Sequence, residues 1–278
     1  MNNEQRIIIM TSKQVAKKKE TGLTSYNYGD MAGKGFEEVS KDDMVIPFLN
    51  ILQTNSPQVD DDSIPEAKAG MFFNTATQEL YEEIVFQPVY NTKHFVEWVP
   101  RNEGGDGAPV AIYDVDSDVV EKAIESNGGN KYGGLTVNGN NLVETHYVYG
   151  NLLSADGKDL LDFVVLAFSS TKISPKNKWF MGMMKVHKDV PLIAHRAILG
   201  AVKQKNKLGT FYNVVIQPLK GTWKESLINP ETQKHLLDEA VANLEMLQAG
   251  EKKVDYSQQN SSNGGSDPVA EGNDDIPF

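Results

Sequence analysis

Cysteine is absent from the 278 residues, and this absence removes several kinds of chemistry at once. Without a thiol the chain cannot form disulfides, thiolate-bound zinc sites or a cysteine nucleophile. No apolar run approaches the roughly 18 residues that a membrane-spanning helix needs. The apolar run near the start, residues 7–10, is too short for the core of a signal peptide. We therefore expect a cytoplasmic protein of a reducing compartment.

Basic residues are fewer than acidic residues, and the net charge of −11 would ordinarily argue against a nucleic-acid partner. The distribution of the charge reverses that inference. Residues 170–224 contain eleven Lys or Arg residues and one acid, Asp189, which gives this basic block a net charge of +10 and leaves −21 for the rest of the chain. A polyanion responds to the local field and not to the pI. The basic block is therefore predicted to bind nucleic acid.

Shifts in composition predict three parts of the chain. Residues 1–40 carry three consecutive lysines and scattered glycines, which favours a flexible basic arm. Residues 41–248 hold the dense apolar runs and form the expected folded core. Residues 249–278 contain, after Lys253, five acids and no base. Such a polar segment cannot bury enough apolar area to offset its ordering entropy, so we expect a disordered acidic tail.

The core is predicted to be β-rich (α+β) with added helices. Pro88, inside the first predicted strand, favours an edge position or a bulge. Two segments with an apolar stripe predict helices, residues 191–204 and residues 229–248, the second capped by Asn229 and ended by Gly250. Segments rich in β-branched and aromatic residues predict strands. These strands cover residues 83–99, 142–153, 160–168 and 210–219, with long surface loops at 102–107 and 126–141.

The chain ends in Asp274, Asp275, Ile276, Pro277 and Phe278, an apolar tip on an acidic tether. This ending resembles the C-terminal tip of bacterial single-stranded-DNA-binding proteins, in which acids precede Ile-Pro-Phe. The resemblance implies that the tip docks on replication and repair enzymes. Phe278 would fill an apolar pocket, its carboxylate would meet a basic side chain, and the two aspartates would engage a basic rim. The alternative is an incidental acidic tail.

Two stretches of the core are similar to phage-encoded single-stranded-DNA-binding proteins. They are IPFLNILQTNSPQV, residues 46–59, and AKAGMFFNTATQELYEEIVFQPVYNTKHFVEWVPR, residues 67–101. No short motif anchors this second likeness, which covers much of residues 44–101. It implies an OB-fold-like β-barrel core and a phage source. The sequence as a whole implies no nucleotide or metal cofactor.

Lysines and aromatic residues of the basic block are the candidate DNA contacts. Lysines can follow a phosphate backbone, while aromatic faces stack bases at ~1–3 kcal/mol each whatever the sequence. We expect Trp179 to be exposed for this purpose; the alternative is that the lysines only solvate the surface and the aromatic residues belong to the core. The candidates are Lys172, Lys176, Lys178, Trp179, Lys185, Lys188, Arg196, Lys203, Lys205, Lys207, Tyr212 and Trp223.

The function that these observations favour is non-enzymatic binding of single-stranded DNA, without sequence preference, in phage replication, recombination and repair, with enzymes recruited by the tip. An annealing recombination protein is an alternative of the same partner class. A metal-dependent nuclease is an alternative of another class, with Asp114, Asp116 and Asp118 as ligands. These aspartates lack the glycine and glutamate of a calcium loop.

Two further patterns do not fit a site. His187 and His195 lie eight residues apart without a cysteine, which is not a zinc spacing. The segment GGNKYGG, residues 128–134, lacks the Lys-Ser/Thr ending of a phosphate-binding loop.

Overall fold

The computed structural model describes residues 34–35, 45–61, 63–100, 103–104, 107–186, 189–206 and 209–259. The chain divides into two units, Met1–Ser40 and Lys41–Phe278. All helices and strands that the structure describes lie in the second unit. The predicted flexible arm, apart from residues 34–35, and the acidic tail from residue 260, including its tip, lie outside the described residues.

The second unit is built mainly from strands, with helices inserted between them. Its elements, in chain order, are β1 (Val45–Ile46), β2 (Leu49–Ile51), α1 (Pro57–Asp60), β3 (Phe72–Asn74), β4 (Leu80–Tyr81), β5 (Ile84–Trp98), β6 (Ala111–Asp114), α2 (Asp118–Ser126), β7 (Thr136–Val137), β8 (Asn140–Leu153), β9 (Leu160–Ser169), η4 (Ser170–Lys172), α3 (Ile173–Val186), η5 (Leu192–Ala194), β10 (Ala197–Asn206), β11 (Gly209–Pro218), α4 (Lys234–Gln248), β12 (Lys253–Val254) and η6 (Tyr256–Gln258).

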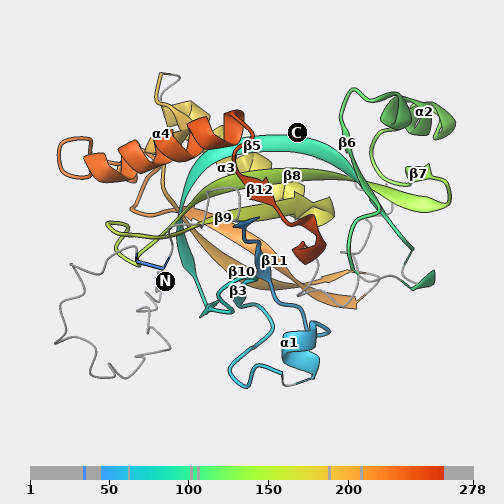
Figure 1. The fold of residues 1–278 in the computed structure, drawn as a ribbon, viewed down its shortest axis with the longest axis horizontal. Helices are drawn as coiled ribbons and strands as arrows, with labels where there is room; N and C mark the ends of the chain where they lie inside the picture. Colours follow the sequence, from blue (N-terminus) through green and yellow to red (C-terminus); the bar gives the residue numbers. More distant parts are fainter. Residues whose placement is uncertain are drawn as a thin grey trace, which may run out of the picture. The chain divides into compact units, whose positions relative to one another are not determined.

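The main sheet is antiparallel and is organised around β5 and β8, which Figure 1 shows as two long curved strands side by side. Its strand order is β11-β10-β5-β8-β7, with β6 also paired to β5 and β9 also paired to β8. The pairing of β5 with β8 shifts register between Pro88 and Tyr90. A β-bulge therefore accommodates the proline inside a central strand, which confirms one of the two expectations for Pro88.

The β-rich class is confirmed, but the expected OB-fold-like barrel is wrong. Among the described residues the strand order of the main sheet is open, and β11 ends it on one side. At Tyr212 a side chain, not another strand, pairs with the outer edge of β11: Gln53 Nε2 donates to the Tyr212 carbonyl at 3.0 Å, and the Tyr212 amide donates to Gln53 Oε1 at 2.7 Å. Capping an edge in this way leaves the sheet unclosed.

The four predicted strands are confirmed as β5, β8, β9 and β11, but the predicted helix over residues 191–204 is wrong. Most of that segment is β10, which pairs with β11 along its full length and with β5 at Ala197–Leu199. Ala197 and Leu199 are buried and alternate with less buried neighbours, as a strand requires. Long-range pairing thus overrides a local pattern that suits a helix equally well.

The predicted helix over residues 229–248 is confirmed as α4, with a later start. Asn229 does not cap it; its Oδ1 accepts from the Glu231 amide at 2.8 Å in the preceding turn, and the helix begins at Lys234. Gly250, with φ +72°, follows its end as expected. Helices α2 and α3 were not predicted from the sequence.

Side chains of the main sheet alternate between two covered faces. The inner face, which carries Phe86, Val148 and Leu199, packs against α3 through Trp179 and Met183 and against β2 and β3. The outer face packs against α4, β1, β12 and η6. The central part of β9 is therefore buried on both sides, as its continuous apolar run predicts.

A chain of buried side-chain amides fixes α4 on the outer face. Asn151 Nδ2 on β8 donates to Gln87 Oε1 on β5 at 2.9 Å, and Asn243 Nδ2 on α4 donates to Asn151 Oδ1 at 3.0 Å. Lys252 Nζ donates to Asn243 Oδ1 at 2.6 Å. Because each amide has a partner, the network orients α4 without leaving a desolvated polar group.

The folded part continues beyond the predicted boundary at residue 248. Strand β12 pairs in parallel with β1, and the Tyr256 ring lies 5.3 Å from the Tyr147 ring, centroid to centroid. The Tyr147 hydroxyl donates to Gln259 Oε1 at 2.7 Å, and Gln259 is buried. The expected disorder of residues 254–259 is therefore wrong: Val254 and Tyr256 supply apolar area that the polar average of the tail conceals.

Candidate nucleic-acid interface

Helix α3, which lies within the basic block, has a buried side and an exposed side. Lys176, Trp179 and Met183 recur at helical spacing and are buried against the inner face. The opposite side is open to solvent, and two of its apolar side chains are largely exposed, Met181 at 55% and Met184 at 70%. The residues of this exposed side are Ser174, Asn177, Lys178, Met181, Met184 and Lys185.

The expectation that Trp179 is exposed is wrong. Its side chain is 2% exposed, and its ring lies 5.2 Å from that of Phe180, 6.2 Å from that of Phe86 and 6.5 Å from that of Phe168. Asn177 and Lys178, which precede Trp179 in the sequence, lie on the solvent side of the same helix. An indole in this position stabilises the core and is out of reach of a base.

Lys176 is also buried, at the end of a polar chain on the inner face. Its Nζ lies 2.9 Å from His146 Nδ1 and 4.4 Å from the centroid of the Phe180 ring. His146 Nε2 lies 2.8 Å from Glu144 Oε1, which also pairs with Lys93 Nζ at 2.8 Å. The bonds from His146 and Lys93 lower the pKa of Glu144 to about 2, whereas burial lowers the pKa of Lys176. Lys176 therefore serves the packing of α3, and its expected exposure to phosphates is wrong.

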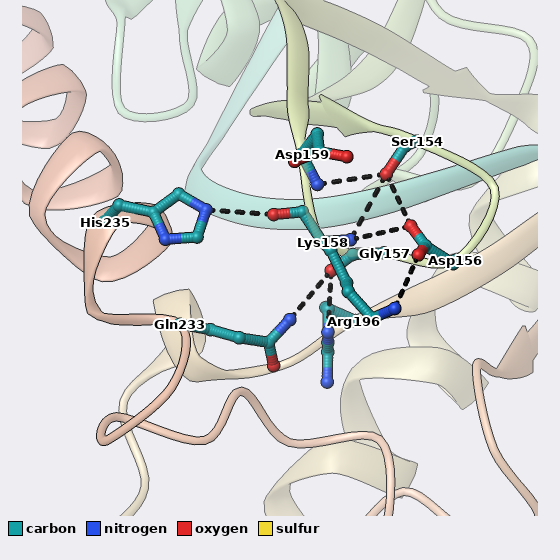
Figure 2. A network of polar contacts seen from close by, with 8 residues as sticks. All are labelled: Ser154, Asp156, Gly157, Lys158, Asp159, Arg196, Gln233 and His235. Atoms are coloured by element: carbon teal, nitrogen blue, oxygen red, sulfur yellow. Dashed lines mark hydrogen bonds and ion pairs between the residues drawn. The ribbon is translucent and has the colours of Figure 1, made fainter.

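Arg196 connects the turn at Gly157 with the segment Ser226–Leu227, and Figure 2 shows its contact with Gly157. It is 3% exposed and donates from Nη1 to the Gly157 carbonyl at 2.7 Å, from Nε to the Ser226 carbonyl at 3.2 Å and from Nη2 to the Leu227 carbonyl at 2.9 Å. Gln233 donates to the same Gly157 carbonyl at 3.1 Å. The predicted role of Arg196 as an exposed phosphate contact is therefore wrong, because its donors point into the protein.

Replacing Arg196 by methionine should lower the free energy of unfolding by about 3 kcal/mol, because two buried carbonyls and one partly buried carbonyl lose a charged donor. Urea unfolding followed by circular dichroism measures this change. Lys158→Met, on the exposed turn beside Gly157, is the matched control and should change stability by less than about 0.5 kcal/mol. A stable Arg196→Met protein with reduced DNA affinity would restore Arg196 to the interface.

The other two aromatic candidates pack over glycines of neighbouring segments. A Cβ on Gly182 of α3 would lie 2.4 Å from Trp223 Nε1, and a Cβ on Gly70 would lie 2.7 Å from Tyr212 Cδ1. Both rings are partly buried and pack against the core of the inner face. Only the remaining exposed part of each ring is accessible to a ligand.

Beyond Leu199, strands β10 and β11 leave β5 and continue as a two-stranded ribbon, residues 200–206 and 209–215. Lys203 lies opposite Tyr212 and Lys205 lies opposite Thr210. Because side chains alternate along a strand, both lysines share the side of Leu199, the side against which α3 packs. Both are exposed. The ribbon and α3 therefore bring lysines from two parts of the basic block to neighbouring elements.

The remaining candidates occupy varied positions. Lys172 is half-buried and lines a small pocket with Asn50, Phe168 and Val214 among its walls. Lys188 and Lys207 lie outside the described residues. Lys178, Lys185, Lys203 and Lys205 are exposed, and within the described part of the chain none of them forms an ion pair.

The three aspartates of the nuclease alternative lie along one connection. Asp114 ends β6, where its Oδ1 lies 3.2 Å from His94 Nδ1; Asp116 is in the following turn; Asp118 opens α2. Over the described ranges, no three His, Cys, Asp or Glu residues are grouped so that they could hold a metal ion. His195 is buried, and His187 lies outside those ranges.

One exposed aromatic residue was not among the sequence candidates. Tyr132 is 68% exposed in the loop between α2 and β7, beside Lys131. The signal was available in the sequence, as a Lys-Tyr pair between two pairs of glycines in GGNKYGG.

No helix in the described ranges is long and apolar enough to cross a membrane.

Comparison with known proteins places the chain in a family. No curated protein and no solved structure matches the chain. A family model described as Pam3 phage gp34-like protein matches residues 16–253. The chain therefore belongs to the Pam3 phage gp34-like protein family, in agreement with the phage source that the sequence resemblance implied.

Proposed function

We propose that this protein binds single-stranded DNA without sequence preference and recruits replication and repair enzymes through its C-terminal tip. The observation that carries the first part is a set of exposed lysines on α3 and the ribbon that form no ion pair with any residue that the structure describes: Lys178, Lys185, Lys203 and Lys205. Ammonium groups that are not neutralised by protein carboxylates are available to replace the counterions of a phosphate backbone.

Exposed apolar side chains beside the lysines of α3 favour the binding of a single strand over that of a duplex. Met181 and Met184 lie with Lys178 and Lys185 on the exposed side of α3. A single strand offers unstacked bases whose apolar faces can contact such side chains, whereas a duplex hides those faces in its stack. Flexible methionines adapt to any base, which suits binding without sequence preference.

The experiment that tests this proposal is a competition. A fluorescent oligo-dT of fixed length is bound to the protein and then displaced by unlabelled oligo-dT, mixed-sequence single strands, duplex DNA or RNA. We expect all single strands of DNA to displace the probe within about threefold of one another and duplex DNA to be at least about tenfold weaker. Equal displacement by duplex would contradict the proposal.

The C-terminal tip gives a separate prediction. Phe278→Ala should abolish the capture of partner enzymes from a bacterial lysate, because it removes the ring that would fill their apolar pocket and keeps all the acids. DNA affinity should not change. Val269→Ala, which removes an apolar side chain elsewhere in the same tail, is the matched control and should capture every partner. Mass spectrometry of the captured proteins compares the variants, and retention of all partners by Phe278→Ala would reject the role of the tip.

A further inference from the structure

The loop of residues 127–135, between α2 and β7, has a shape fixed by its own hydrogen bonds. Asn127 Nδ2 donates to the Asn130 carbonyl at 2.7 Å and to the Gly133 carbonyl at 3.1 Å, while the Tyr132 amide donates to Asn130 Oδ1 at 2.9 Å. Leu135, 3% exposed, anchors the end of the loop in the core beneath α2. The hydrogen bonds of Asn127 and Asn130 and the burial of Leu135 therefore hold the loop in one conformation.

Glycines make this conformation possible. The pairs at 128–129 and 133–134 have φ between +68° and +82°, values that other residues rarely adopt. They bend the chain before and after Lys131 and Tyr132, so that the two side chains are presented at the top of the loop. The four glycines thus define the conformation of the loop, although the side chain at its tip does not contribute to the core.

The ring of Tyr132 is the most exposed aromatic side chain that the structure describes, at 68%. Its recorded ring contact is with Lys131, whose Nζ lies 5.2 Å from the ring centroid. One cation near an exposed ring leaves most of the aromatic surface in water. Exposing that surface does not stabilise the fold. A preorganised loop that holds an aromatic ring in water is suited to stack the ring on a ligand with a flat face of its own.

We propose that Tyr132 and Lys131 form a nucleobase-stacking site, which rests on the proposed binding of single-stranded DNA and adds a contact outside the basic block. Tyr132 would stack on one base, and Lys131 would contact the adjacent phosphate. Exposed acids of α2, Glu121 and Glu125, disfavour a longer phosphate track here. The contribution therefore comes mainly from the ring and should depend little on salt.

Three variants of the full chain separate a ring contact from a charge contact. Tyr132→Leu keeps an apolar side chain and removes the ring. We expect its affinity for oligo-dT to fall about fivefold or more, with an unchanged slope of affinity against salt. Tyr132→Phe is the matched control and should bind as the parent does. Lys131→Ala should instead reduce the log–log salt slope by about 0.7. Thermal unfolding should be the same for all, because residues 131 and 132 are exposed.

A direct readout comes from the variant Tyr132→Trp. An indole at this exposed position should be quenched when oligo-dT stacks on it, over the signal of the parent's own tryptophans. Unchanged oligo-dT affinity of Tyr132→Leu, together with no added quenching in Tyr132→Trp, would overturn the stacking site while leaving the proposed function intact. The site is also overturned if Tyr132→Leu binds oligo-dT as the parent does but no longer captures a partner protein. Failure of the parent to bind any single strand would reject the proposed function itself.

Discussion

Replacing Lys178, Lys185, Lys203 and Lys205 together by alanine should weaken binding of oligo-dT by about a few hundredfold at ~0.1 M salt, because four phosphates lose their ammonium partners. The log–log slope of affinity against salt should become shallower by about 3, at about 0.7 per phosphate. Fluorescence anisotropy at several salt concentrations measures both quantities. Stability should change little, since all four side chains are exposed.

A control with the same change in net charge distinguishes local contacts from general attraction. Lys68, Lys122, Lys158 and Lys234 lie outside the basic block, and alanine at these four positions also removes four charges. We expect the control to weaken binding by less than about threefold at ~0.15 M salt, where charges more than ~8 Å away are screened. Equal losses in the two quadruple variants would show that the basic block has no special role.

Trp179→Ala should lower the free energy of unfolding by about 3–5 kcal/mol, the usual cost of removing a large aromatic side chain from a core. The indole contacts the rings of Phe86, Phe168 and Phe180, so its loss leaves a cavity between α3 and the inner face. Urea unfolding measures the change. Protein that remains folded at low temperature should bind DNA through its exposed lysines with nearly parental affinity.

Met181→Ala is the matched control, because Met181 lies on the same helix with its side chain 55% exposed. It should leave the unfolding free energy within about 0.5 kcal/mol of the parent. If Trp179→Ala were as stable as Met181→Ala and bound DNA poorly, the indole would contact DNA and its assignment to the core would be wrong.

The strands that sequence could identify are those whose residue types leave little choice. Residues 160–168, for example, form a continuous apolar run of strand length, a pattern typical of a strand that is covered on both sides. The segment at 197–204 was ambiguous, because Ala197 and Ala201 suit a helical stripe while Ala197 and Leu199 suit a strand face. Pairing with β5, more than 100 residues earlier in the chain, decides between them.

Some missed elements had local signals and others did not. Asn138-Gly139, with φ of +51° and +88°, is the turn of the hairpin between β7 and β8, and an Asn-Gly dipeptide is a sequence signal for such a turn. Helix α3 was hidden by Pro175 and Gly182, which lower helix propensity. Gly182 has its reason in the close approach of Trp223, a contact that the sequence cannot reveal.

The candidate interface also combines features that the sequence reveals with features that depend on tertiary contacts. The charge segregation of the basic block was visible in the sequence, whereas the direction of each side chain was not. Lys176 is buried with His146 as its partner, and Arg196 is buried with the carbonyls of Gly157, Ser226 and Leu227 as its partners. These partners come from distant parts of the chain. Burying a cation is tolerated only with such partners, which depend on the tertiary structure.

The salt dependence of oligo-dT binding by the intact protein tests most directly whether the protein binds single-stranded DNA through its exposed lysines. A fixed concentration of labelled oligo-dT is titrated with protein at salt concentrations from ~0.05 to ~0.5 M, and the logarithm of the association constant is plotted against the logarithm of the salt concentration. The exposed lysines of α3 and the ribbon predict a steep negative slope of about −3 or more, at about −0.7 per phosphate contact. A flat line, or no measurable binding at the lowest salt concentration, would contradict the account.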